Sequence, residues 1–180
     1  MRTLVLAGRR IDPAGASRSS FPGQAVGLVA EGIRRLLADE RVEALVASGA
    51  CGADLVAHAE AGRAGLRRRM VLPFAPARFR ATSVVDRPAT EGWDWGRLFD
   101  RIATELAAAG DLIVHHRTAA YAAVNMRLID EAAALAAPGA PLAAVVWEGT
   151  ARGSGDHTAD FLRLACERGL VVHELPSLPS

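Results

Sequence analysis

Short apolar runs alternate with longer amphipathic segments along the chain of 180 residues, and this alternation constrains the fold more than any other feature of the sequence. The apolar runs have the length of buried strands, and the segments between them repeat apolar residues with the spacing of a helix face. Strands that are apolar throughout and separated by helices indicate a parallel sheet with helices on both faces. The runs predicted as strands are residues 3–7, 43–47, 69–72, 111–115, 142–147 and 170–174. The segments predicted as helices begin near residues 22, 55, 95, 119 and 158.

The predicted fold class is α/β: a single three-layer α/β/α domain over residues 1–180, with a doubly wound, mainly parallel, Rossmann-like sheet of about six strands. A chain of this length usually forms one domain, and crossovers between parallel strands are right-handed. In such a sheet, ligands bind beyond the carboxyl ends of the strands, near the point where the strand order reverses. The segments that follow the predicted strands are therefore the candidate binding segments.

The sequence contains no lysine, so its 21 Lys+Arg residues are all arginines. A phosphate-binding loop of the GxxxxGK[ST] type is impossible without its lysine. Enzymes that hold pyridoxal phosphate or a carbonyl substrate as a lysine Schiff base are excluded for the same reason. An anion bound by this chain must be met by arginine, backbone N–H groups, hydroxyls or a metal ion.

The formal net charge of +1 provides no bulk electrostatic attraction to nucleic acids or membranes. We therefore expect no DNA, RNA or membrane partner. Two cysteines, Cys51 and Cys166, are too few for a disulfide framework and are typical of a reducing compartment. The first residues lack the apolar core of a signal peptide, and no apolar stretch approaches the ~20 residues of a membrane span. These features predict a cytoplasmic protein.

The first candidate phosphate-binding segment is the turn SGACGAD at residues 48–54, between a predicted strand and a predicted helix. Gly49 and Gly52 allow a ligand to approach the main chain, so a β-branched residue at Gly52 is predicted to abolish binding without unfolding the protein. The helix that follows presents unpaired N–H groups and a partial positive charge. Asp54 is predicted to cap this helix or to accept a ribose hydroxyl. Ser48 completes the candidate set, Cys51 is interpreted as a small filler of the turn, and a turn that needs glycine only for structure is the alternative.

The second candidate segment is GTARGSGDHT at residues 149–158, between the fifth predicted strand and the last predicted helix. Glycines and hydroxyls in this position form a cradle for phosphate. A mobile surface loop is the alternative, and Asp156 is predicted to cap the helix. The residues assigned to the cradle are Gly149, Thr150, Gly153, Ser154, Gly155 and Thr158.

Arginines supply a third candidate element. Arg9 and Arg10 follow the first strand, and the planar arginine fork suits bidentate phosphate recognition. Residues 73–92 show neither strand nor helix periodicity, and a connection of this length is typical of a lid or binding loop. The lid residues expected to close over the ligand are Arg78, Arg80, Thr82 and Ser83, with Arg87 farther along the same loop.

Tyr121 and Asn125 lie four residues apart on one helix face and are candidates to hold a base or ribose. Asn125 alternatively caps a neighbouring loop. The sequence has no CxxC or HExxH motif and no clustered carboxylates, so we predict neither a metal nor another cofactor.

With these segments together, the chain resembles the SLOG superfamily of Rossmann-like nucleotide-binding domains, which includes the LOG phosphoribohydrolases. The matching pieces are a strand ending in Gly8, the turn at residues 48–54 and the loop EGTARGSGD at residues 148–156. The resemblance implies a pocket for a nucleotide or a sugar phosphate, and it implies that related chains form dimers, so a homo-oligomer is expected. The residues that it places in the pocket are Gly8, Gly49, Gly52, Asp54, Gly149, Thr150, Gly153 and Gly155.

One departure from the family pattern bears on catalysis. LOG hydrolases carry a PGGxGTxxE motif whose glutamate belongs to the catalytic site, and this chain has Gly153 where that glutamate would fall. Cleavage of an N-glycosidic bond needs a positioned carboxylate, and Asp54 is the strongest substitute in the motifs. Binding or sensing of a nucleoside phosphate or an ADP-ribose-like ligand is therefore favoured. The alternatives are a phosphoribohydrolase that uses Asp54 as its catalytic acid, and a purely structural interaction protein.

Overall fold

The computed structural model describes residues 1–115 and 121–179, with the backbone alone for residues 121 and 122. Strands and helices alternate along these residues, as the apolar pattern predicts, except that two helices separate the third strand from the fourth. The strands are β1 (Thr3–Gly8), β2 (Ala44–Ala47), β3 (Arg67–Leu72), β4 (Leu112–Val114), β5 (Leu142–Trp147) and β6 (Val172–Pro176). The helices are α1 (Val26–Asp39), α2 (Ala53–Arg63), α3 (Pro76–Ser83), α4 (Trp95–Ala108), α5 (Tyr121–Ala136) and α6 (His157–Glu167), with a short 3₁₀ turn over Gly23–Ala25.

The strands form one parallel sheet in the order β4-β3-β2-β1-β5-β6. From β1 the chain proceeds to one edge through β2, β3 and β4, and then returns through α5 to place β5 on the other side of β1. The strand order therefore reverses between β1 and β5. This arrangement confirms the doubly wound, Rossmann-like α/β fold.

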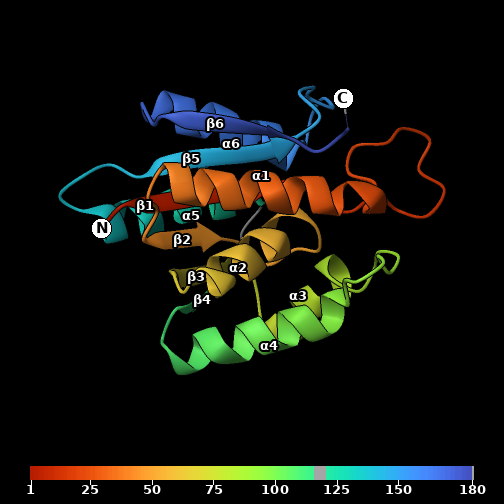
Figure 1. Cartoon of the computed structure of the whole chain (residues 1–180), viewed down its shortest axis with the longest axis horizontal. Helices are drawn as coiled ribbons and strands as arrows, with labels where there is room; N and C mark the ends of the chain where they lie inside the picture. The colour runs from red at the N-terminus through yellow and green to blue at the C-terminus, as the bar shows by residue number, and fades with distance from the viewer. Residues whose placement is uncertain (116–120, 180) are drawn as a thin grey trace.

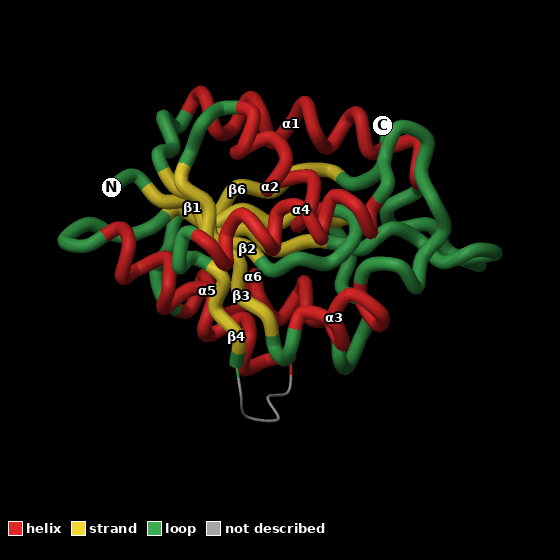
Figure 2. The backbone as a smooth tube through the Cα atoms, turned by 90° about the horizontal axis from the view of Figure 1, so that it is seen from below, coloured by secondary structure: helices red, strands yellow, loops and turns green. Residues whose placement is uncertain are grey.

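Helices α1, α2 and α4 cover one face of the sheet, and α5 and α6 cover the other (Figures 1 and 2). Alternate residues of each central strand divide between the two faces: Leu4 and Leu6 of β1 pack under α1 and α2, whereas Val5 packs against α5 and α6. Because both faces are covered, the central strands are apolar throughout. Among the described residues, no helix has the length and hydropathy needed to cross a bilayer.

Part of the segment predicted as an irregular lid is helical. Pro76 begins α3 at a first-turn position, where its missing N–H group is no loss. Within this eight-residue helix only Phe79 and Ser83 are buried, so the segment lacks the longer apolar repeat by which a helix is recognised in a sequence. Helix α3 lies beside the carboxyl ends of the strands, near α4 (Figure 1).

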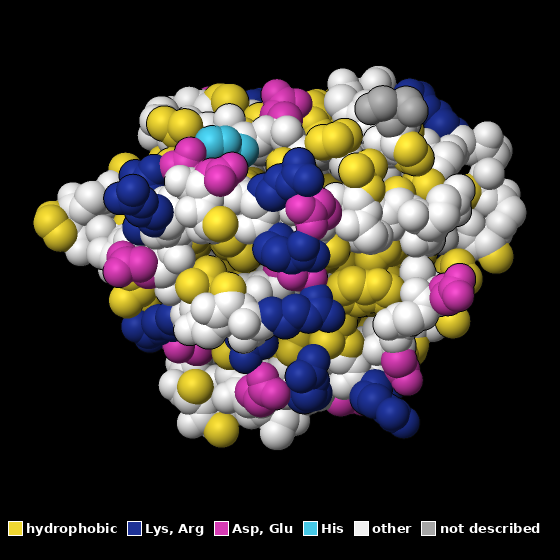
Figure 3. Space-filling model, in the orientation of Figure 1, with side chains coloured by type: hydrophobic (Ala, Val, Ile, Leu, Met, Phe, Trp, Pro, Cys, Tyr) yellow, Lys and Arg dark blue, Asp and Glu magenta, His cyan; other side chains and the backbone are white. Residues whose placement is uncertain are grey.

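Arginines and acidic residues are interspersed over the face formed by α1, α2 and α4 (Figure 3). Several of them form ion pairs, including Arg35 with Glu31 at 2.7 Å and Arg68 with Glu105 at 2.8 Å. Such exposed pairs contribute little to stability. They do balance the charge of this surface.

Candidate functional site

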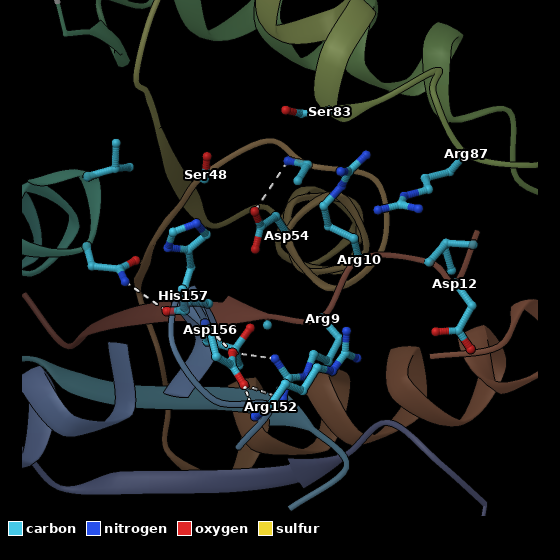
Figure 4. A pocket seen from close by; sticks show the side chains of 18 of the residues that line it. Arg9, Arg10, Asp12, Ser48, Asp54, Ser83, Arg87, Arg152, Asp156 and His157 are labelled. Carbon is cyan, nitrogen blue, oxygen red and sulfur yellow. Dashed lines mark hydrogen bonds and ion pairs between the residues drawn. The ribbon is translucent and has the colours of Figure 1, made fainter. Parts of the chain in front are cut away.

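A cavity of about 500 Å³ opens beyond the carboxyl ends of β1, β2 and β5, and the strand order reverses between β1 and β5 (Figure 4). Its walls come from the segments after β1, β2 and β5 and from helices α2, α3, α5 and α6. A cavity of this size holds a small-molecule ligand. Its lining residues are Ala7, Gly8, Arg9, Arg10, Ile11, Asp12, Pro13, Ser48, Ala50, Asp54, Phe79, Ser83, Arg87, Val124, Asn125, Leu128, Arg152, Ser154, Gly155, Asp156, His157 and Thr158.

Both glycine-containing turns border this cavity. The turn between β2 and α2 contributes Ser48 and Asp54, and the segment between β5 and α6 contributes Ser154, Gly155 and Thr158. The remaining candidates from these two turns do not line the cavity. They are Gly49, Cys51, Gly52, Gly149, Thr150 and Gly153.

Gly8 lines the cavity and also permits the close approach of two elements. A β-carbon at this position would lie 2.5 Å from the β-carbon of Ala53 and 2.7 Å from that of Val146. The start of α2 and strand β5 therefore both pack directly against the end of β1. This packing brings the two turns to the same cavity.

Gly52 serves the protein chain rather than a ligand. Its backbone has φ +110° and ψ −133°, and a β-carbon would lie 2.7 Å from the carbonyl oxygen of Arg9. The segment after β1 lies against this turn, where the N–H of Ile11 donates to the carbonyl of Cys51 at 3.2 Å. The prediction that substitution of Gly52 removes binding but leaves the fold intact needs correction, because the glycine is a packing requirement. Gly49 likewise packs against Met70 and Phe99.

Arg9 is buried, and its guanidinium is occupied by protein groups. Its Nε donates to Glu148 at 2.6 Å, its Nη1 and Nη2 bind the two oxygens of Asp156, and its Nη2 also donates to the Thr150 carbonyl at 3.0 Å. The side chain is 5% exposed. Arg9 therefore fastens the segment after β5 to the end of β1, which corrects the expectation of a free phosphate contact.

Asp156 is the second half of this contact and caps α6, as predicted. Its Oδ1 accepts from the backbone N–H groups of Thr158 and Ala159, both at 3.1 Å, and its Oδ2 accepts from the N–H of Arg152 at 2.8 Å. Burial opposes ionisation of the carboxyl, but the hydrogen bonds from Arg9 and the backbone outweigh it and lower the pKa to about 2. The carboxylate is thus charged at neutral pH.

Asp54 lies in the first turn of α2, where Gly52 and not Asp54 is the N-cap residue. Its carboxyl faces the cavity, and Oδ2 accepts from the N–H of Ala50 at 3.3 Å (Figure 4). Burial raises the pKa of Asp54 to about 7, against the opposing effects of that hydrogen bond and of the charge on Arg10. A carboxyl that titrates near neutral pH inside a cavity can exchange a proton with a ligand.

His58, one turn farther along α2, supports the same turn from behind. Its Nε2 is 2.9 Å from the carbonyl oxygen of Ser48, and burial lowers the pKa of the ring to about 4. The neutral imidazole therefore donates to this carbonyl and fixes the position of Ser48. The sequence did not single out His58, because α2 is buried on all sides from Ala53 to Ala61 and no amphipathic pattern marks the residues that face the turn.

Replacing Asp54 with asparagine is expected to stabilise the folded protein above neutral pH. The unfolded carboxyl loses its proton near pH 3.8 and the folded one near pH 7, so stability present at low pH is lost as the pH rises through this interval. Asparagine has no charge to bury, so we expect its free energy of unfolding to be about 1–2 kcal/mol higher than that of the parent at pH 8. Urea unfolding of both proteins at pH 4 and pH 8 measures it. A difference that is the same at both pH values would contradict this assignment.

Most of the predicted lid residues do not line the cavity. Arg80 pairs with Asp100 of α4 at 2.7 Å, Arg78 lies 4.5 Å over the ring of Phe74, and the hydroxyl of Thr82 donates to the Arg78 carbonyl at 3.0 Å. These contacts belong to helix α3 itself and to its packing. Ser83 and, from the segment beyond the helix, Arg87 are the residues of this region that line the cavity beside Phe79.

The wall formed by α5 is mainly apolar. Val124 and Leu128 line the cavity, and the amide of Asn125 donates to the carbonyl of His157 at 2.8 Å, which joins α5 to the start of α6. Tyr121 is the first residue of α5, and its side chain lies outside the described residues. The sequence analysis did not predict four of the cavity residues. Val124 and Leu128 follow an ordinary apolar helix pattern, and no motif marks Asp12 or His157 as a ligand contact. Within residues 1–115 and 121–179, no group of three or more His, Cys, Asp or Glu side chains is placed to hold a metal ion.

No protein-family model matches the chain, and no curated protein sequence matches it. Among solved structures, the chain is similar to the X-ray structure of DNA processing protein A (DprA) from Streptococcus pneumoniae, with a TM-score of 0.53 and 17% sequence identity. The match covers 96% of this chain and 50% of that protein, so the chain spans about half its length. At this identity the likeness shows the Rossmann-like α/β fold.

The comparison also corrects the expectation about nucleic acids. A formal net charge of +1 led us to exclude DNA as a partner. The similar structure is that of a DNA-processing protein, so this fold occurs in a protein that handles DNA. The exclusion is therefore wrong, because a net charge summed over the whole chain does not describe the charge of one site.

Proposed function

We propose that the chain binds a nucleoside phosphate or an ADP-ribose-like ligand in the cavity at the reversal of strand order, as a domain of the SLOG type. The observation that carries this proposal is the convergence of two glycine-containing turns, from β2–α2 and β5–α6, on one cavity of about 500 Å³. Ligands of doubly wound sheets bind at this position. The volume suits a mononucleotide or a somewhat larger derivative.

The chemistry of the walls supports the same class of ligand. Val124, Leu128 and Phe79 provide apolar surface for a base or the carbon face of a sugar, and Ser48, Ser154 and Thr158 provide hydroxyls. Pockets of this mixed character hold a ligand by apolar contact and orient it by a few polar groups. Arg10 and Arg87, which also line the cavity, supply positive charge for phosphate.

A thermal-shift screen tests the proposal. The panel contains adenosine, guanosine and cytidine with zero, one or two phosphates, ADP-ribose and a short single-stranded DNA. The DNA tests whether the site binds nucleotides within a nucleic acid. A ligand present at 100 times its dissociation constant adds about 2.7 kcal/mol, which raises Tm by roughly 5–10 °C for a chain of this size. We expect this shift from at least one phosphorylated nucleoside and not from its unphosphorylated form.

Two substitutions in one exposed loop test whether the ligand binds in this cavity. Ser154 lines the cavity and Thr150 does not, although both are exposed. Ser154→Trp is expected to abolish the ligand-induced shift by filling the mouth of the cavity, and Thr150→Trp is expected to preserve it. The proposal fails if no member of the panel shifts Tm, or if both variants bind as the unmodified protein does.

Hydrolysis of an N-glycosidic bond is the second candidate, and the environment of Asp54 favours it. A carboxyl with a pKa of about 7 can protonate a departing base or accept a proton from water at neutral pH. Incubation with the same nucleotides, followed by chromatography of free bases, tests this activity. Hydrolysis predicts base release that Asp54→Asn abolishes while binding remains. Binding without any base release would reject hydrolysis.

A further inference from the structure

Two arginines face the end of the cavity that lies toward α3 and the segment after it (Figure 4). Arg10 follows β1 and Arg87 follows α3, so they come from segments far apart in the chain. Their side chains are 28% and 25% exposed. Both are therefore partly withdrawn from water while they remain open to the cavity.

In the part of the chain that the structure describes, Asp86 is the one carboxylate that forms ion pairs with these two guanidinium groups. Arg10 forms an ion pair with Asp86 through Nη2, and the Nε of Arg87 lies 3.9 Å from the other oxygen of Asp86. The Nε atoms of Arg10 and Arg87 are buried and, among the described residues, neither has a hydrogen-bond acceptor. A buried donor without an acceptor is unfavourable, so both guanidinium groups keep hydrogen-bonding capacity that Asp86 does not use.

Arg9, Arg152 and Asp12, which also line the cavity, are already matched by protein groups. Arg9 is bound by Glu148 and Asp156, and Arg152 donates to Glu148 at 3.0 Å. Asp12, on the same side as Arg10, accepts the N–H groups of residues 20 and 21 and the hydroxyl of residue 19, which holds its carboxylate on its own loop. The buried carboxyl of Asp54 interacts with the charge on Arg10, but its pKa of about 7 leaves it only partly ionised at neutral pH. The unmatched positive charge therefore lies at Arg10 and Arg87 and not at the glycine-rich segment after β5.

We propose that Arg10 and Arg87 bind a phosphoryl or diphosphate group and that Asp86 is the internal anion that this group displaces. The Ser83 hydroxyl lines the same wall and adds a donor. The rest of the ligand then extends toward Ser48 and the apolar residues Val124 and Leu128 of α5. This orientation rests on the proposed function, whereas the anion site itself does not depend on what the phosphate is attached to.

Inorganic pyrophosphate is the probe, because it requires no contact with a base or sugar. Isothermal titration with the full chain is expected to show binding that Arg87→Gln and Arg10→Gln each weaken about tenfold, the loss of one charge-assisted contact. Arg152→Gln is the matched control, since Arg152 lines the same cavity but is paired with Glu148. It is expected to leave pyrophosphate affinity within about twofold.

Asp86→Asn distinguishes a binding site from a structural ion pair. The substitution removes the competing negative charge and keeps the side-chain shape, so we expect pyrophosphate to bind roughly three- to tenfold more tightly. A merely structural Asp86 would give weaker or unchanged binding, which overturns the inference. This variant gains affinity, so its result does not depend on loss of folding in the arginine variants.

The outcomes separate this inference from the proposed function. Binding of nucleotides without binding of pyrophosphate overturns the anion site and leaves the proposed function. Equal losses in Arg87→Gln and Arg152→Gln also overturn it. Pyrophosphate binding that shows the expected variant effects supports the anion site. If no nucleoside-containing ligand binds, the proposed function is rejected, but this support for the anion site remains.

Discussion

Replacing Gly52 with alanine is expected to lower the free energy of unfolding by about 3 kcal/mol or more. The backbone angles at Gly52, φ +110° and ψ −133°, belong to a region that residues with a β-carbon rarely adopt. The added carbon would also lie 2.7 Å from the carbonyl oxygen of Arg9 and 2.9 Å from the backbone nitrogen of Ile11. Because both neighbours are main-chain atoms, no side-chain rotation can relieve the contact.

Thermal and urea unfolding measure this loss, with Gly153→Ala as the matched control. Gly153 also has a positive φ of +93°, but a β-carbon there meets no atom within 4 Å. We expect the control to cost about 1 kcal/mol, from backbone strain alone. The Gly52 variant should melt roughly 6–12 °C lower than the parent. Similar losses in the two variants would show that the contact with the segment after β1 is unimportant.

The fold could be predicted from the sequence because a strand buried on both faces is apolar at every position. Runs such as residues 142–147 contain no polar residue that would mark an exposed face, and right-handed crossovers then restrict the topology. The strand order itself was not encoded locally. It depends on the return of the chain through α5 to the other side of β1, which no local pattern specifies.

The site was predictable to the level of segments and not of side chains. Glycine-containing turns after β2 and β5 were identified, since parallel strands end at one edge of a sheet. Sequence could not show that Arg9 is taken by Glu148 and Asp156, because these partners lie 139 and 147 residues away. A free arginine and a paired one have the same sequence signature.

The sequence likewise does not show whether a glycine is needed for the approach of a ligand or for the packing of the chain. At Gly52 a main-chain neighbour, not a ligand, occupies the space that a β-carbon would need. The buried carboxyl of Asp54 illustrates a second limit: its pKa of about 7 arises from burial against the cavity wall, a property of the assembled fold. Sequence patterns therefore located the edge of the sheet that carries the site, and the tertiary contacts decided which residues are available to a ligand.

Replacing Arg9 with methionine is expected to destabilise the protein by about 3–5 kcal/mol at pH 7. The substitution keeps most of the apolar stem but leaves the carboxylates of Glu148 and Asp156, which are 3% and 2% exposed, without their shared cation. Arg152→Met is the control: its side chain is 43% exposed and pairs only with Glu148 in the described structure. We expect it to cost less than about 1 kcal/mol.

The pH dependence of this loss tests its electrostatic origin. The pKa of Asp156 is about 2 in the folded protein and 3.8 ordinarily, so its ionised form contributes stability above about pH 4 that disappears as the pH falls toward 2. The gap between the parent and Arg9→Met should therefore be largest at neutral pH and should narrow below pH 4. Urea unfolding at pH 7 and pH 3 measures the gap. A gap that stays constant would attribute the loss to packing, and the segment after β5 would then be held to β1 by shape and not by charge.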